Sequence, residues 1–290
     1  MKNPVWRKEM QVSARSWKFA LGLFLFNAVL ALIGVAVFSN ICMYEGDPAY
    51  YYEDILYFYS VLMVIEAAMV CFIVPATTAG AISGERERQT LEILLTTTMR
   101  PWQIIFGKLM ASISTVLLYV VSSLPVVSLV FIVGGLKVQD VLQTLLYFCV
   151  LSVYLGSIGI FFSTKFKKSI VATVCTYGVL VFTNFIIYFI ALFYVVFHSL
   201  IGDNTWVDLD LGLWTGLGLL SPMNSVFAVA DMQMGGTDIL QAVALIGEPT
   251  GWPEMSPTTW WFLSMIVQIT IAGLALFFAS RRLYPLKKKR

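Results

Sequence analysis

Six stretches of this chain are apolar for long enough to cross a lipid bilayer, and this limits its possible folds more than any other feature. A helix that spans the hydrocarbon core needs about 20 mostly apolar residues. Runs of that kind cover residues 19–42, 57–82, 104–133, 141–164, 170–198 and 259–280. Composition agrees, because 59% of the 290 residues are hydrophobic and only 12% are charged. We predict an all-α integral membrane protein with six transmembrane helices.

The distribution of basic residues predicts the orientation of the spans. Of the 19 Lys and Arg residues, 18 lie in four places: before the first span, around the link between spans two and three, around the link between spans four and five, and after the last span. The exception is Lys137. The other links are acidic. Because Lys and Arg concentrate in cytoplasmic links, we predict an even number of spans, with both termini in the cytoplasm. We expect a multi-pass protein of the plasma membrane.

Residues 199–258 leave one alternative open. The stretch 211–230 carries no charge and could cross the membrane together with 239–247, which would give eight spans. Several glycines, Pro222 and Asn224 interrupt it. We therefore favour six spans and predict that 199–258 is an external loop with short helices.

The first 18 residues mix apolar and basic side chains at partial helical spacing, as in Trp6-Arg7-Lys8-Glu9-Met10. This pattern favours an amphipathic cytoplasmic helix that lies on anionic lipid. A solvated basic leader that only sets orientation is the alternative. We predict such a helix over 1–18, followed by a single transmembrane domain over 19–290.

Several kinds of chemistry are missing from the sequence. The chain has a single histidine, His198, so we expect neither a Ser-His-Asp set nor a His-based metal cluster. Gly107-Lys108 resembles the end of a phosphate loop, but Trp102 stands where the loop needs glycine and Leu109 where it needs Ser or Thr. We predict no catalytic residue, no metal site, no directly bound cofactor and no nucleic-acid partner.

The short link between the second and third spans carries the strongest functional signal. Residues 85–95 are largely good helix formers, and Leu91, Leu94 and Leu95 fall on one helical face. Pro101 ends the helix before the next span. We predict a short amphipathic helix over 85–97. Its leucine face either packs on the ends of the spans or docks in a groove on a soluble partner, with the charged side chains as a polar rim.

This link resembles the signature of the permease subunits of bacterial ABC type 2 exporters. That pattern runs roughly Ser-x-Glu-Arg-Glu-x-Gly-Thr-Leu-Glu-x-Leu-Leu, followed by Pro and then Gly-Lys. The matching residues are Ser83, Glu85, Arg86, Glu87, Thr90, Leu91, Glu92, Leu94, Leu95, Pro101, Gly107 and Lys108. Gln89 replaces the usual glycine, and this departure predicts a more continuous helix. Asn3-Pro4-Val5 resembles the start of the family's N-terminal elbow helix.

The resemblance implies a permease that moves a substrate outward with energy from a separate ATPase. Two ATPase subunits, which would bind ATP and magnesium, and a second permease, identical or related, would complete the assembly. The 85–97 helix would be a coupling helix seated on the ATPase. Its coupling residues would be Glu85, Arg86, Glu87, Arg88, Thr90, Leu91, Glu92, Leu94 and Leu95.

Three polar residues inside the spans are candidates for the translocation path. Glu66 lies well inside the second span, where a charge costs roughly 2.5–3.5 kcal/mol on insertion scales. It either lines the path or is protonated, paired with a neighbouring span, or near the surface. Asn27 and Asn184 are the other candidates, although amides in spans commonly bond between helices.

Two other functions fit the same topology. The chain could be a non-transporting membrane anchor or sensory subunit that binds a cytosolic partner through the same link. It could also be a secondary transporter, for which we would expect more intramembrane charge and an inverted repeat. An ATPase with a phosphate loop encoded beside this chain would favour the exporter.

Overall fold

The structure is a computed structural model that describes residues 4–43, 48–96, 99–132, 137–201, 218–234 and 256–288. Within these ranges all regular elements are helices. Six of them contain segments long and apolar enough to cross a membrane: Trp17–Val37, Phe58–Glu87, Pro101–Ser128, Val138–Lys165, Ser169–Ile186 and Pro257–Leu283. The prediction of an all-α protein with six spans is confirmed.

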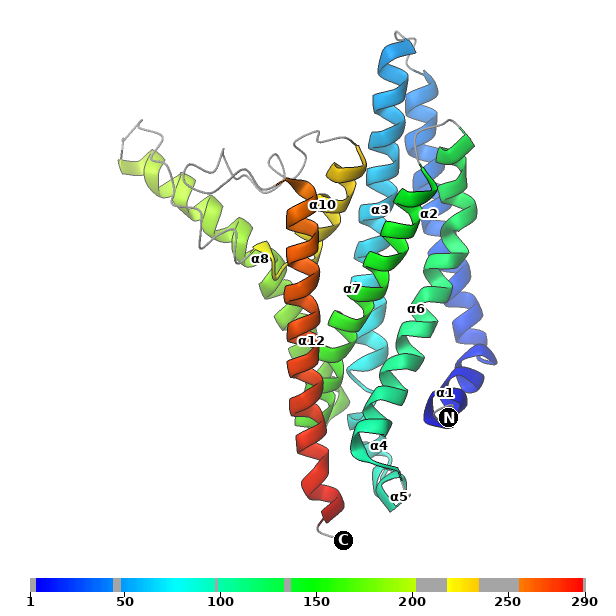
Figure 1. Cartoon of the computed structure of the whole chain (residues 1–290), viewed down its shortest axis with the longest axis vertical. Helices are drawn as coiled ribbons and strands as arrows, with labels where there is room; N and C mark the ends of the chain where they lie inside the picture. Colours follow the sequence, from blue (N-terminus) through cyan, green and yellow to red (C-terminus); the bar gives the residue numbers. More distant parts are fainter. Residues whose placement is uncertain are drawn as a thin grey trace. The chain divides into compact units, whose positions relative to one another are not determined.

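The helices follow the chain in a simple order (Figure 1). Their bounds are α1 (Pro4–Ala14), α2 (Trp17–Met43), α3 (Pro48–Thr78), α4 (Ser83–Glu87), α5 (Leu91–Thr96), α6 (Pro101–Ile132), α7 (Val138–Lys165), α8 (Ser169–Ile201), α10 (Pro222–Gln233) and α12 (Pro257–Lys288). The candidate span that runs to Glu87 includes residues 58–78 of α3, a turn and the whole of α4.

The chain forms two compact units, which we describe separately. The first contains Met1–Tyr177 and Ile269–Arg290, and the second contains Gly178–Gln268. Helices α8 and α12 each contribute one part to both units. A single transmembrane domain over 19–290 stays a prediction.

In the first unit, α3, α6 and α7 pack against one another, and α2 packs on α3 and α6. Two glycines of α7 make the close approach possible. A Cβ on Gly156 would lie 2.8 Å from Leu109 Cδ1, and one on Gly159 would collide with the Thr78 hydroxyl. In Figure 1, α1, α4, α5 and the C-terminal end of α12 lie at the same end of this unit. Helix α1 and the C-terminal end of α12 therefore lie at one end of this unit, as an even span number requires.

Helix α1 is separate from the first span. Pro4 occupies its first position, where the missing N–H is no loss. The helix ends at Ala14, a turn follows in which Ser16 N donates to Ser13 O at 3.0 Å, and α2 begins at Trp17. Helix α1 packs on α6. Its predicted position on anionic lipid stays a prediction.

The second unit contains α10, which begins within the stretch 211–230 that we considered as an additional span. Ser221 caps this helix by accepting a hydrogen bond from Asn224 N, and Pro222 follows at the first position. Its 12 residues give a length of about 18 Å, well short of the roughly 30 Å hydrocarbon core. Helix α10 therefore does not cross the membrane. Residues 202–217 and 235–255, which include the 239–247 run, lie outside the described residues.

Candidate functional site

The predicted coupling helix consists of two short helices, α4 and α5, joined at Gln89. Gln89 has a φ of 59°, which is left-handed backbone. Its N–H donates to Arg86 O at 3.1 Å, and Thr90 N donates to Glu85 O at 2.9 Å. These two bonds form the Schellman arrangement that ends helices. The prediction of one continuous helix over 85–97 is therefore wrong, because Gln89 adopts the backbone conformation for which the family pattern has glycine.

The Lys108 ammonium links this segment to two other helices. Its Nζ lies 3.0 Å from Glu85 Oε1 on α4 and 3.0 Å from Glu9 Oε1 on α1. The Lys108 side chain is only 7% exposed. Glu85 also accepts a hydrogen bond from the Thr90 hydroxyl through its second oxygen. Since a buried ammonium is tolerated where carboxylates compensate it, the three charges hold α1, α4 and α6 together.

Arg86 and Glu87 attach the same segment to the ends of two further helices. The Arg86 guanidinium donates to Phe166 O at 3.1 Å and to Thr164 O at 3.4 Å, at the C-terminal end of α7. Those carbonyls lack partners inside the helix. The Glu87 carboxylate accepts hydrogen bonds from Ser169 N at 2.9 Å and Ser169 Oγ at 2.8 Å. An acidic group at the start of α8 also favours the helix dipole.

A buried serine of α7 fixes the start of α4. Ser163 Oγ accepts hydrogen bonds from Ile82 N at 2.8 Å and Ser83 N at 2.9 Å. Ser83 Oγ donates to Ala79 O at 3.1 Å. Both serines are fully buried. These bonds satisfy backbone N–H groups at the start of α4 that would otherwise be unpaired.

The leucine face of α5 packs on the chain itself. Leu91 and Leu95 are buried in a cluster with Ile82, Ile104 and Leu109, and Leu94 packs against the same cluster. Of the two expectations for this face, the described residues therefore show packing on the ends of the spans. Leu91 and Leu95 present little surface to a partner. Likewise Glu85, Arg86 and Glu87 bond to their own chain instead of forming a free polar rim.

The opposite face of α5 is open. Ile93 is 69% exposed, and Glu92 and Thr96 are exposed beside it. Arg88, which caps α4, is exposed as well. Because Leu91 and Leu95 fix the other face of α5 in the apolar cluster, Ile93 gives its exposed face an apolar centre.

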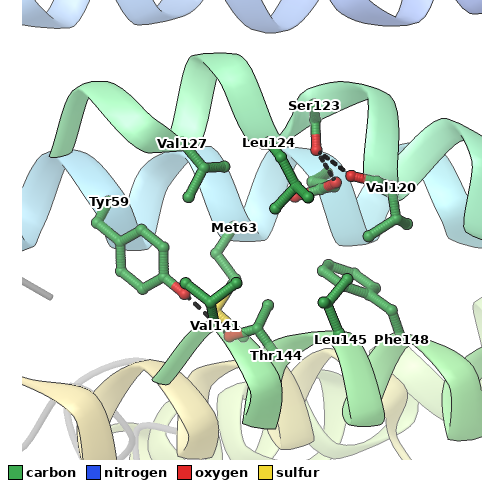
Figure 2. Close-up of a pocket in the computed structure, with 11 residues that line it drawn as sticks. Tyr59, Met63, Val120, Ser123, Leu124, Val127, Val141, Thr144, Leu145 and Phe148 are labelled. Carbon is green, nitrogen blue, oxygen red and sulfur yellow. Dashed lines mark hydrogen bonds between the residues drawn. The ribbon is translucent and has the colours of Figure 1, made fainter. Parts of the chain in front are cut away.

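Glu66 lies between α3 and α6 in the first unit. It is 4% exposed, and its Oε1 accepts a hydrogen bond from Ser123 Oγ at 2.6 Å. The small cavity beside it is also lined by Tyr59, whose hydroxyl lies 2.9 Å from Thr144 Oγ1 (Figure 2). Its volume is about 20 Å³, which is room for one water molecule. In this conformation the cavity is too small for a transported solute.

The two asparagines among the candidate residues bond between helices. Asn27 Nδ2 on α2 donates to Ser122 Oγ on α6 at 2.8 Å. In the second unit, Asn184 Oδ1 on α8 accepts hydrogen bonds from Ser221 Oγ at 3.0 Å and Met223 N at 3.3 Å. These contacts are of the kind that amides commonly make in spans. A role for either residue in a translocation path stays a prediction.

The structure brings the residues predicted around 85–95 together but adds two partners that the sequence analysis missed. Lys108 was considered as part of a failed phosphate loop and of the family pattern, but not as a partner of Glu85, and Ser163 was not considered. Both contact α4 from positions distant in the sequence. The family pattern's Gly-Lys pair was the one available signal for Lys108, and no comparable signal marks Ser163.

Comparison with known families covers most of the chain. The family model described as ABC-2 family transporter protein matches residues 4–201. The matched region includes α1, α4, α5 and the start of α6, and therefore the complete Lys108 ion cluster. A search among curated proteins finds no match.

Proposed function

Because the chain belongs to the ABC-2 family of transporter proteins, we propose that it is the permease subunit of an ATP-driven exporter that moves its substrate outward. A membrane permease of this family provides the route, and the chemical energy comes from an ATP-binding-cassette ATPase. In the proposal, two ATPase subunits bind ATP and magnesium and associate with two permeases, identical or related.

One observation carries the proposal: a single short segment is bonded to several spans at once. Through Glu85, Arg86 and Glu87 it contacts α6, the end of α7 and the start of α8. A push on this segment would therefore act on three membrane helices together. A segment that only anchored a partner would not need an attachment to each of them.

We place the ATPase contact on the exposed face of α4 and α5, around Arg88, Glu92 and Ile93. Ile93 provides an apolar centre and the charged neighbours a polar rim, as in protein interfaces generally. In the proposal the motion is transmitted inward by the buried Leu91 and Leu95, the partly buried Leu94, and Glu85, Arg86, Glu87 and Thr90.

The translocation path is a separate part of the proposal. Glu66 is its candidate, because a separation of α3 from α6 would break the hydrogen bond to Ser123 and enlarge the cavity beside it. Asn27 and Asn184 would then hold neighbouring helices in register. The proposed orientation puts both termini and α4–α5 in the cytoplasm and the protein in the plasma membrane, as the positive-inside rule favours.

Reconstitution tests the proposal. The chain is co-expressed with a candidate ATP-binding-cassette ATPase from the same genome, purified in detergent and placed in liposomes. We expect the two proteins to co-purify and ATP turnover by the ATPase to rise when the permease is present. Absence of association would contradict the proposal. Association without any permease effect on ATP turnover would favour the membrane anchor instead.

A further inference from the structure

A cavity of about 380 Å³ lies in the first unit, away from the Glu66 cavity. Parts of α1, the start of α2, α3 and α6 line it. Its volume is within the range of pockets that hold small molecules. No residue of α4 or α5 lines it, so it is separate from the exposed face proposed to bind the ATPase.

Two donor groups in this cavity have no partner among the described residues. The Lys18 ammonium at the start of α2 forms no ion pair within that part of the chain. Tyr119 is 7% exposed, its ring contacts Phe19 and Phe26, and its hydroxyl makes no hydrogen bond to any described residue. Because the Tyr119 hydroxyl is not among the fully buried polar atoms that lack a partner, it is open to the cavity and can donate to an acceptor that enters it.

Ser13 and Ser16 add two hydroxyl groups to the lining, and the other polar side chains supply acceptors. Glu9 uses only its Oε1 for Lys108, so its second carboxylate oxygen is available. The hydroxyl protons of Thr77 and Thr115 are donated to carbonyls of their own helices, which leaves oxygen lone pairs to the cavity. Such a set suits a group with several N–H donors, as a primary ammonium has.

The surroundings of the cavity are those of a membrane surface. Trp17 and Val12 are exposed beside it, and Phe19 and Ile73 add apolar surface to its wall. An exposed tryptophan at the start of a span is typical of the membrane–water interface. An occupant therefore needs a polar head and an apolar body.

We propose that this cavity binds the headgroup of an amine-bearing zwitterionic phospholipid, of the phosphatidylethanolamine class. The lipid phosphate accepts hydrogen bonds from Lys18 and Tyr119, and its ammonium donates to Glu9, Thr77 and Thr115. A phosphatidylcholine headgroup has no N–H to donate, and a phosphatidylglycerol headgroup has no cation for Glu9. Lys18 is exposed, as Arg7 and Lys8 are, but those two do not line the cavity and suit anionic lipid in general.

Native mass spectrometry of the full chain tests this proposal. The protein is released from nanodiscs that contain equal amounts of phosphatidylethanolamine, phosphatidylcholine and phosphatidylglycerol, and retained lipids are counted by mass. We expect preferential retention of one phosphatidylethanolamine. Lys18→Gln should reduce this retention about fivefold, because a charge-assisted contact is lost. Tyr119→Phe keeps the ring contacts and should reduce it about twofold.

Arg15→Gln is the matched control. Arg15 is an exposed basic residue in the same leader, but it does not line the cavity. Retention by Arg15→Gln should equal that of the unaltered chain. The proposal is overturned if phosphatidylcholine or phosphatidylglycerol is retained as well as phosphatidylethanolamine, or if Lys18→Gln behaves like Arg15→Gln.

Discussion

Lys108 Nζ lies 3.0 Å from Glu85 Oε1 and so connects the first third of α6 directly to the short helix α4. The same ammonium reaches Glu9 on α1. The lysine is nearly buried, whereas both carboxylates keep partial contact with solvent. The pair is therefore a structural connection whose loss should be measurable.

Lys108→Met should loosen this connection. We expect the free energy of unfolding to fall by about 2 kcal/mol, because charge-assisted hydrogen bonds are lost while the two carboxylates can still hydrate. The measurement is unfolding of the purified chain in mixed micelles by a denaturing detergent. In a double-mutant cycle with Glu85→Gln, the two effects should not add. Strict additivity would show that the two side chains do not interact.

Gln89→Gly should stabilise the chain. A left-handed backbone costs a residue with a side chain about 1–2 kcal/mol. Glycine avoids this cost, but it loses more backbone entropy on folding, which offsets part of the stabilisation. We expect a net gain of about 0.5–1 kcal/mol in the same unfolding assay. Glu92→Gly is the control, since residue 92 lies inside α5 and should lose stability. A loss at both positions would contradict the left-handed turn at Gln89.

Arg86→Lys should weaken the attachment of α4 to α7. A lysine has no planar fork and can reach only one of the two carbonyls that Arg86 contacts. The expected loss is about 1 kcal/mol. Arg88→Lys, at an exposed neighbouring position, should leave unfolding unchanged. Equal behaviour of the two variants would argue against the bond to the end of α7.

Glu66→Gln should be tolerated, with a change in unfolding free energy below about 0.5 kcal/mol. Glutamine has nearly the same size and keeps an oxygen that can accept the Ser123 hydrogen bond. The residues that line the cavity include no Lys, Arg or His that would lose a partner. Glu66→Ala, in contrast, should cost about 2 kcal/mol by leaving a cavity, although the Ser123 hydroxyl keeps Val120 O as an acceptor. Equal losses would show that the charge itself is needed.

The number of spans could be predicted because it depends on local properties of the sequence. Long apolar runs give the spans, and glycines with Pro222 mark the stretch that does not cross. The bend at Gln89 could not be predicted from propensity, since glutamine is a good helix former. It depends on the hydrogen bonds of Gln89 and Thr90 to α4, which override that preference.

The position of the candidate site could be predicted from its motif, but the contacts between its residues could not. The partners of Lys108 lie 99 and 23 residues away along the chain, so no spacing in the sequence joins them. The direction of the leucine face was also open, because both a partner groove and the chain's own helices can bury leucine. Packing of Leu91 and Leu95 on the ends of the spans distinguishes the two.

The central claim is that an ATPase binds the exposed face of α5 and transmits its motion to the permease there. Ile93→Glu tests it most directly, with Val138→Glu as control, because the two side chains are 69% and 70% exposed and Val138 lies at the start of α7. The measurement is permease-dependent ATP turnover in liposomes that contain the co-expressed ATPase. We expect Ile93→Glu to lower it about tenfold, as loss of an interface centre does, and Val138→Glu to leave it unchanged. Full turnover with Ile93→Glu would contradict the claim.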